Sequence, residues 1–110
     1  KKDKDIRPVR EVKAYLEENY HQEISLNDLA DIVSLNASYL SALFKKETGM
    51  TYTEYVMFCR LEKAKELLAD TGKSIAEIAD AVGYHDTRHF SKLFTRNIGL
   101  KPSEYRKLYS

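Results

Sequence analysis

Apolar side chains recur every three or four residues along most of the chain, which is the period of an amphipathic α-helix. The pattern predicts seven helices, over residues 8–20, 26–33, 37–48, 52–70, 75–82, 87–97 and 102–109. No segment shows the alternation of apolar and polar residues that is typical of a strand. The sequence therefore predicts an all-α fold.

The chain contains two similar copies of one pattern. Residues 25–33 match residues 74–82 at an offset of 49, with identical Ser, Ala, Asp and Val positions. Beyond them the offset becomes 50, and Phe44 then coincides with Phe94. One extra residue near His85 accounts for the change. Two copies are too few for a solenoid, so we interpret them as a tandem pair of similar units.

Local signals delimit two helices in each copy. Polar residues suited to cover the free amides at a helix start stand at Ser25, Asn36, Ser74 and Asp86. Glycines suited to end the second helices stand at Gly49 and Gly99. Each copy thus consists of a short helix, a tight turn and a second helix, which is the helix-turn-helix plan.

A long predicted helix, residues 52–70, separates the copies and begins with a capping box, Thr51-x-x-Glu54. Its apolar residues span more than half the circumference, as expected for a helix that packs against both copies; they are Tyr55, Phe58, Cys59, Leu61, Ala64, Leu67 and Leu68. The predicted organisation is an N-terminal linker (1–7), a first helix-turn-helix subdomain (8–50), a linker helix (51–71) and a second subdomain (72–110).

Composition narrows the class of protein. The chain is 43% apolar, which suffices for a core, and it has one cysteine, which excludes a disulfide framework and fits the reducing cytoplasm. No apolar run reaches the roughly 20 residues that cross a bilayer, so no membrane partner is expected. The chain opens with lysine, and we expect a fragment of a longer protein or a processed product.

The net charge of +1 says little, but its distribution is uneven: residues 84–110 carry six basic and only two acidic side chains. In a helix-turn-helix the second helix enters the major groove, where short polar side chains approach base edges and long basic ones reach guanines or phosphates. The predicted DNA-contacting residues are Ser38, Tyr39, Ser41, Ala42, Lys45, Lys46, Thr87, Arg88, His89, Ser91, Lys92, Arg96 and Lys101.

Two stretches resemble the AraC/XylS family of bacterial transcription regulators. They are Ile75-x-x-Ile78-Ala79-x-x-Val82-Gly83-Tyr84-x-Asp86-x-x-x-Phe90-Ser91-x-x-Phe94 with Gly99-x-x-Pro102-x-x-Tyr105-Arg106, and Tyr39-Leu40-Ser41-x-x-Phe44-Lys45-x-x-x-Gly49. The resemblance covers residues 8–109. It implies two homeodomain-like subdomains whose recognition helices, about 37–48 and 87–97, enter successive major-groove segments.

Carried over by position, the resemblance implies base-reading residues in both recognition helices: Ser38, Ser41, Ala42, Thr87, Arg88, Ser91 and Lys92. Ala42 departs from the long polar residue that similar proteins often have there, although alanine can meet a thymine methyl group. Lys101 replaces the Thr51 of the first copy, so the last helix lacks a hydroxyl cap, and we expect Lys101 to face a phosphate.

The resemblance also implies partners. Such domains form the C-terminal output part of longer regulators, either after a phosphoacceptor receiver domain or after an effector-binding domain. The implied partners are double-stranded DNA, RNA polymerase and that N-terminal domain. No cofactor is implied.

Other chemistry has little support in the sequence. Cys59 is expected to be a small buried hydrophobe. His21, His85 and His89 lack the spacing of a metal site, and neither a glycine-rich phosphate loop nor a nucleophile motif is present, so we expect no enzyme and no metal. The alternative to DNA binding is a helical protein-interaction module, since helix bundles also present polar faces to partners.

Overall fold

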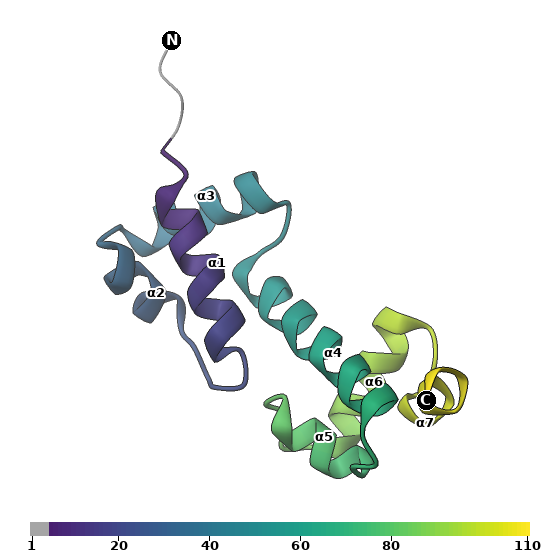
Figure 1. The fold of residues 1–110 in the computed structure, drawn as a ribbon. Helices are drawn as coiled ribbons and strands as arrows, with labels where there is room; N and C mark the ends of the chain where they lie inside the picture. Colours follow the sequence, from purple (N-terminus) through teal and green to yellow (C-terminus); the bar gives the residue numbers. More distant parts are fainter. Residues whose placement is uncertain (1–4) are drawn as a thin grey trace. The chain divides into compact units, whose positions relative to one another are not determined.

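The computed structural model describes residues 5–110, and this part of the chain is all-helical. Its elements are α1 (Arg7–Asn19), α2 (Leu26–Val33), α3 (Ala37–Thr48), α4 (Tyr52–Asp70), α5 (Ile75–Ala81), α6 (Thr87–Ile98) and α7 (Pro102–Tyr109), shown in Figure 1. The predicted all-α fold of seven helices is confirmed. The helix α1 begins one residue earlier than predicted, and residues 1–4 of the predicted linker lie outside the described residues. No described helix is long and apolar enough to span a membrane.

The chain divides into two compact units within α4, between Phe58 and Cys59. We call the described residues up to Phe58 unit 1 and residues 59–110 unit 2. In unit 1, α1 packs against both α2 and α3. The apolar faces of these three helices enclose its core, which consists of Val9, Val12, Leu16, Leu29, Ala30, Leu40, Leu43 and Phe44.

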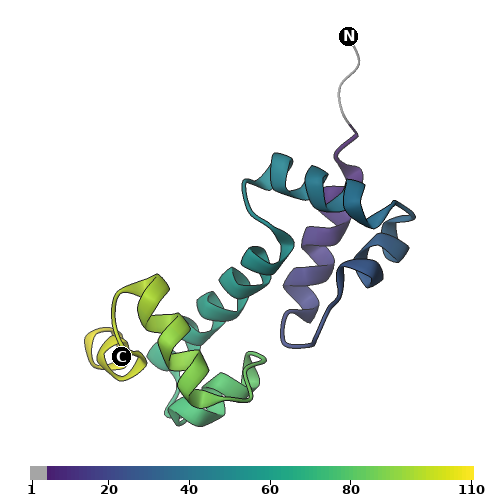
Figure 2. The same ribbon diagram turned by 180° about the vertical axis from the view of Figure 1, so that it is seen from behind.

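Unit 2 repeats this arrangement with the second part of α4 in the place of α1. Its buried apolar residues are Leu61, Ala64, Leu68, Ile78, Ala79, Val82, Phe90 and Phe94, with Pro102 at the start of α7. Figure 2 shows α6 (yellow-green) between the turn that follows α5 and the loop that leads to α7. Leu61, Ala64 and Leu68 recur at the spacing of the buried α1 residues, because both helices present the same apolar stripe to a helix-turn-helix.

The first part of α4 has the same structural role in unit 1 as α7 has in unit 2, since each follows the second helix of a helix-turn-helix and packs a tyrosine against it. The Thr51 N–H donates to Glu54 Oε1 at 2.9 Å, and the Lys101 N–H donates to Glu104 Oε1 at 2.9 Å. In each unit a tyrosine of this helix meets a recognition-helix phenylalanine edge to face: the ring centroids are 5.8 Å apart for Phe44 and Tyr55, and 5.7 Å apart for Phe94 and Tyr105. The helix α4 therefore combines two roles of the repeated unit: its first part corresponds to α7, and its second part corresponds to α1.

Two residues of α4, Phe58 and Cys59, are less buried than the sequence predicted. Phe58 was expected in the apolar set of the long helix, but its side chain is 46% exposed. Tyr55 lies nearer the core and stacks on Phe58 at 6.2 Å, so Phe58 covers the outer side of that ring. Cys59 is half-buried and not a fully buried hydrophobe.

Candidate nucleic-acid interface

The turn between the two helices of each helix-turn-helix is closed by the same hydrogen bond. The Leu35 N–H donates to the Ala30 carbonyl at 3.0 Å in unit 1, and the Tyr84 N–H donates to the Ala79 carbonyl at 2.8 Å in unit 2. The residue before each donor has a positive φ, 57° at Ser34 and 110° at Gly83. The turns therefore set α3 and α6 at their starting points by backbone geometry common to both units.

Short polar side chains begin the two recognition helices. Asn36 Oδ1 accepts the Tyr39 N–H at 3.1 Å, and Asp86 Oδ1 accepts the N–H groups of Arg88 and His89 at 3.0 and 3.2 Å. The helices end at glycines with left-handed φ angles, 80° at Gly49 and 91° at Gly99. The extents of α3 and α6 thus follow from local sequence, as predicted.

The inner and outer faces of α6 differ sharply. Phe90 and Phe94, one turn apart, are completely buried. This burial fixes the rotation of α6 about its axis, because turning the helix would expose two aromatic rings. Arg88, Lys92 and Arg96 recur every fourth residue on the exposed side.

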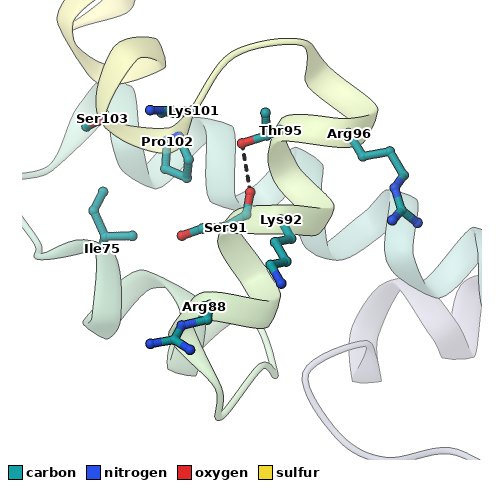
Figure 3. Close-up of a pocket in the computed structure, with 9 residues that line it drawn as sticks. All are labelled: Ile75, Arg88, Ser91, Lys92, Thr95, Arg96, Lys101, Pro102 and Ser103. Atoms are coloured by element: carbon teal, nitrogen blue, oxygen red, sulfur yellow. Dashed lines mark hydrogen bonds between the residues drawn. The ribbon is translucent and has the colours of Figure 1, made fainter.

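An open groove of about 580 Å³ lies along this outer face (Figure 3). The residues from α6 form one side of it, the first residues of α7 lie across from them, and Ile75 lies at the start of α5. The lining residues are Ile75, Arg88, Ser91, Lys92, Thr95, Arg96, Lys101, Pro102 and Ser103. Among residues 5–110, no ion pair engages any of the four cations of this groove. The groove is therefore a positively charged surface available to an anionic partner.

Most of the residues expected to contact DNA in unit 2 come together at this groove. Two do not line it: Thr87 is half-buried, and the ring of His89 lies edge to face against Tyr84 with centroids 5.8 Å apart. The sequence-based list lacked Ser103, which stands where the first copy has Thr53. The repeat did not single it out, because Thr53, its counterpart in the first copy, was not predicted to contact DNA either.

The residues expected to contact DNA in unit 1 lie on α3. Five are exposed, namely Ser38, Tyr39, Ala42, Lys45 and Lys46, while Ser41 is half-buried. Tyr39 is the largest of them, and its side chain is 57% exposed. The side chains along the middle of this surface are short, and its two lysines lie in the last turn of α3.

Arg60 of α4 braces the turn of unit 2. Its guanidinium lies 4.8 Å from the centre of the Tyr84 ring, and its Nη1 donates to the Gly83 carbonyl at 3.3 Å. Burial raises the pKa of the Tyr84 hydroxyl, and the nearby Arg60 charge opposes that rise. No motif of the sequence pointed to Arg60, since its partners lie more than 20 residues away.

The three histidines gather no metal-binding set. Within the described residues, no three or more His, Cys, Asp or Glu side chains form a group that could hold a metal ion. His85 instead pairs with Asp80, with 2.8 Å between Nδ1 and Oδ1, at the surface of the second turn.

The fold and this surface define a tandem helix-turn-helix domain. The family model described as a helix-turn-helix domain matches residues 29–108. The chain belongs to the AraC/XylS family of DNA-binding transcription regulators.

Among its curated relatives is the melibiose operon regulatory protein of Escherichia coli, which is 35% identical over 100 residues, 91% of this chain and 33% of the relative. The Msm operon regulatory protein of Streptococcus mutans is 36% identical over 99 residues, 90% of this chain and 36% of the relative. The chain thus spans about a third of the length of these relatives.

Solved structures agree with this assignment. The C-terminal domain of AraT, a response regulator from Geobacillus stearothermophilus, has a TM-score of 0.88 and 33% identity, covering 93% of this chain and 85% of that one. The DNA-binding domain of AdpA in complex with a target DNA has a TM-score of 0.85 and 25% identity, covering 93% of this chain and 92% of that one.

Proposed function

We propose that this chain recognises a specific double-stranded DNA sequence with α3 and α6 as its recognition helices. The observation that carries the proposal is the α6 groove, where Arg88, Lys92, Arg96 and Lys101 gather without a carboxylate partner among the described residues. Unpaired cations on one face of a helix-turn-helix fit the phosphates and guanine edges of a duplex.

Within the groove we assign two kinds of contact. Arg88 and Lys92 lie in the first half of α6, the part that meets base edges in this motif, and their long donors suit guanine. Arg96 and Lys101 lie further along the groove, towards the end of α6 and the start of α7, where a phosphate backbone would pass. The first pair would supply sequence discrimination and the second affinity.

In unit 1 we assign a mainly positioning role. Ser38, Ser41 and Ala42 are short and offer at most single hydrogen bonds or a methyl contact with thymine. Lys45, Lys46 and the exposed ring of Tyr39 would hold the duplex against α3. The two recognition helices would then meet major-groove segments about 10–10.5 base pairs apart, as successive helix-turn-helix elements do.

We further propose that the chain is the C-terminal output part of a longer cytoplasmic bacterial regulator that acts with RNA polymerase. Its curated relatives are about three times as long as the matched region. The likeness to AraT, a response regulator, supports a phosphoacceptor receiver domain as the N-terminal partner, and the likeness to a xylose-binding transcription activator supports an effector-binding domain. Dimerisation through that domain would raise the local concentration of two DNA-binding units.

Selection of duplexes from a random-sequence library tests the proposal. We expect enrichment of one motif with two half-sites, and an affinity that falls by about 0.9 log units per phosphate contact for each tenfold increase in salt. A protein-interaction module would enrich no motif. Binding that does not respond to salt would contradict a role for the groove cations.

A further inference from the structure

Arg106 differs from the other cations of the C-terminal region because its guanidinium donates three hydrogen bonds to backbone carbonyls of unit 2. Nε donates to the Leu68 carbonyl at 3.1 Å, and Nη2 donates to the carbonyls of Thr71 and Lys73 at 3.2 and 2.6 Å. These acceptors belong to the last turn of α4 and the loop that follows it. In the sequence, Arg106 stands out as one of six basic residues near the C-terminus and as the last residue of the motif Gly99-x-x-Pro102-x-x-Tyr105-Arg106, but neither observation gives it a role.

The acceptors explain why an arginine is needed there. Leu68 is among the last four residues of α4, whose carbonyls have no partner within the helix. A cation near a helix C-terminus satisfies such carbonyls and interacts favourably with the helix dipole. The planar fork of arginine reaches three acceptors at once, which a lysine ammonium on a flexible stem cannot reproduce.

These three hydrogen bonds connect two sides of the α6 groove. On one side, Arg106 belongs to α7, whose first two residues, Pro102 and Ser103, line the groove together with Lys101, the residue before the helix. On the other, the Lys73 carbonyl lies two residues before Ile75, which lines the groove at the start of α5. Arg106 therefore fixes α7, and with it Lys101, relative to the start of α5.

We infer that Arg106 is a positioning residue for DNA binding, which holds Lys101 at the rim of the groove and contacts no phosphate itself. The inference rests on the proposed function, because it explains how the groove keeps its shape. Lys107, the next residue, supplies a matched control: it is exposed, carries the same charge on the same helix and does not line the groove.

The test is a double-mutant cycle on the full chain. Arg106→Met, Lys101→Ala, the double variant and the control Lys107→Met are compared with wild type. The ligand is a duplex that wild type selects from the random library, and affinity is measured at several salt concentrations. Thermal unfolding of each protein first sets a temperature at which all of them are folded. Arg106→Lys is included as a milder variant in case Arg106→Met does not fold.

We expect Arg106→Met to weaken binding roughly tenfold in the wild-type background and much less in the Lys101→Ala background, since residues that act as a unit are not additive. The double variant should show the salt dependence of Lys101→Ala alone. Arg106→Lys should lose part of the affinity, and Lys107→Met should retain the melting temperature of wild type.

Three results would overturn the inference. A further drop of about 0.9 in the salt slope on adding Arg106→Met to Lys101→Ala would show a direct phosphate contact. Additive losses would show that Arg106 acts independently of Lys101, and full affinity of both Arg106 variants would show no role. Failure of wild type to bind any duplex is a different outcome, because it removes the proposed function as well.

Discussion

Units 1 and 2 share a framework and differ in the side chains that it presents. The turn hydrogen bonds, the N-terminal caps, the C-terminal glycines and the phenylalanine–tyrosine contacts recur in both. On the outer surface, three cations of unit 2 replace small side chains of unit 1. The corresponding pairs are Arg88 and Ser38, Lys92 and Ala42, and Lys101 and Thr51. The core and the turns thus set the positions of α3 and α6, and the exposed residues determine what each helix can bind.

The units also differ in how they hold their turns. Unit 2 has glycine at the positive-φ position, an aromatic residue after it and the Arg60 guanidinium over that ring. Unit 1 has Ser34 and Leu35 at these positions. A side chain at φ 57° costs free energy that glycine avoids. The turn before the more cationic recognition helix is therefore the one with more side-chain support and less backbone strain.

The shared framework leads to the largest expected effect, which is in the two cores. Phe44 and Phe94 are each 1% exposed or less, and each meets a tyrosine edge to face. We expect Phe44→Ala and Phe94→Ala each to lower the free energy of unfolding by about 3–5 kcal/mol, because each leaves a cavity among rigid neighbours. Urea denaturation of both variants measures the two costs side by side.

Phe58→Ala serves as the control for ring removal outside the core. Its side chain is 46% exposed, so about 1 kcal/mol is expected. Costs for the two core variants that differ by more than about 2 kcal/mol would contradict the equivalence of the two frameworks.

The chemical difference between the outer faces gives the next effect. Arginine paired with guanine through two hydrogen bonds contributes about 1–3 kcal/mol of discrimination between bases, which a serine hydroxyl cannot match. We expect Arg88→Ala and Lys92→Ala to relax base preference at one half-site, and Ser38→Ala and Ser41→Ala to change it less. Each variant is measured against a library of single-base changes in the selected duplex.

A uniform loss of affinity in Arg88→Ala, together with lost base preference in Ser38→Ala, would reverse the assignment of the two units. Arg96→Ala is the matched control within α6. It removes the same charge from the same groove but lies in the last turn, so it should weaken binding to all sequences alike.

The division between what the sequence predicted and what it did not follows the range of the interactions. Helix ends were predicted almost to the residue because caps act within three or four positions, as at Asn36 and Gly49. The second helix-turn-helix was predicted because its pattern repeats the first. The hydrogen bonds of Arg106 reach carbonyls more than 30 residues away. Every residue has a backbone carbonyl, so the sequence does not reveal which ones accept these bonds.

The sequence placed residues of the groove together only where they lie on one helix. Arg88, Lys92 and Arg96 share one helix face, so periodicity placed them together. Ser103 and Ile75 join them only through the packing of α7 and α5 beside α6. Phe58 shows the opposite error, because an apolar residue at helical spacing lies outside when a neighbouring tyrosine already covers the core.

A smaller effect is expected when the residue with positive φ in one turn is replaced by its counterpart from the other turn. We expect Ser34→Gly to raise the free energy of unfolding by about 0.5–1 kcal/mol, because relief of the left-handed conformation exceeds the entropy that glycine adds to the unfolded chain. The reverse change, Gly83→Ser, should lower it by about 1–2 kcal/mol, since φ at Gly83 is 110°. Thermal melts of both variants provide the measurement, and two changes of the same sign would contradict the strain argument.

The smallest effect concerns two capping carboxylates, one in each unit. A hydrogen bond from the Thr51 N–H, 2.9 Å from Oε1, lowers the pKa of Glu54, and one from the Ser74 N–H at 2.8 Å lowers the pKa of Glu77. A carboxylate whose pKa is lower in the folded state stabilises the protein above its unfolded pKa, near 4.5. That contribution is lost as the pH falls from there through the folded value.

We therefore expect the melting temperature to fall as the pH is lowered from about 5 to 3, and Glu54→Gln and Glu77→Gln each to reduce that fall. Glutamine keeps an acceptor for the backbone N–H but does not titrate, so both variants should be slightly less stable than wild type at pH 7 and should approach it near pH 3. Glu18→Gln, at an exposed position that caps no helix, is the control. If Glu18→Gln reduces the fall as much as the capping variants do, the pH dependence arises from net charge and not from the helix starts that the two units share.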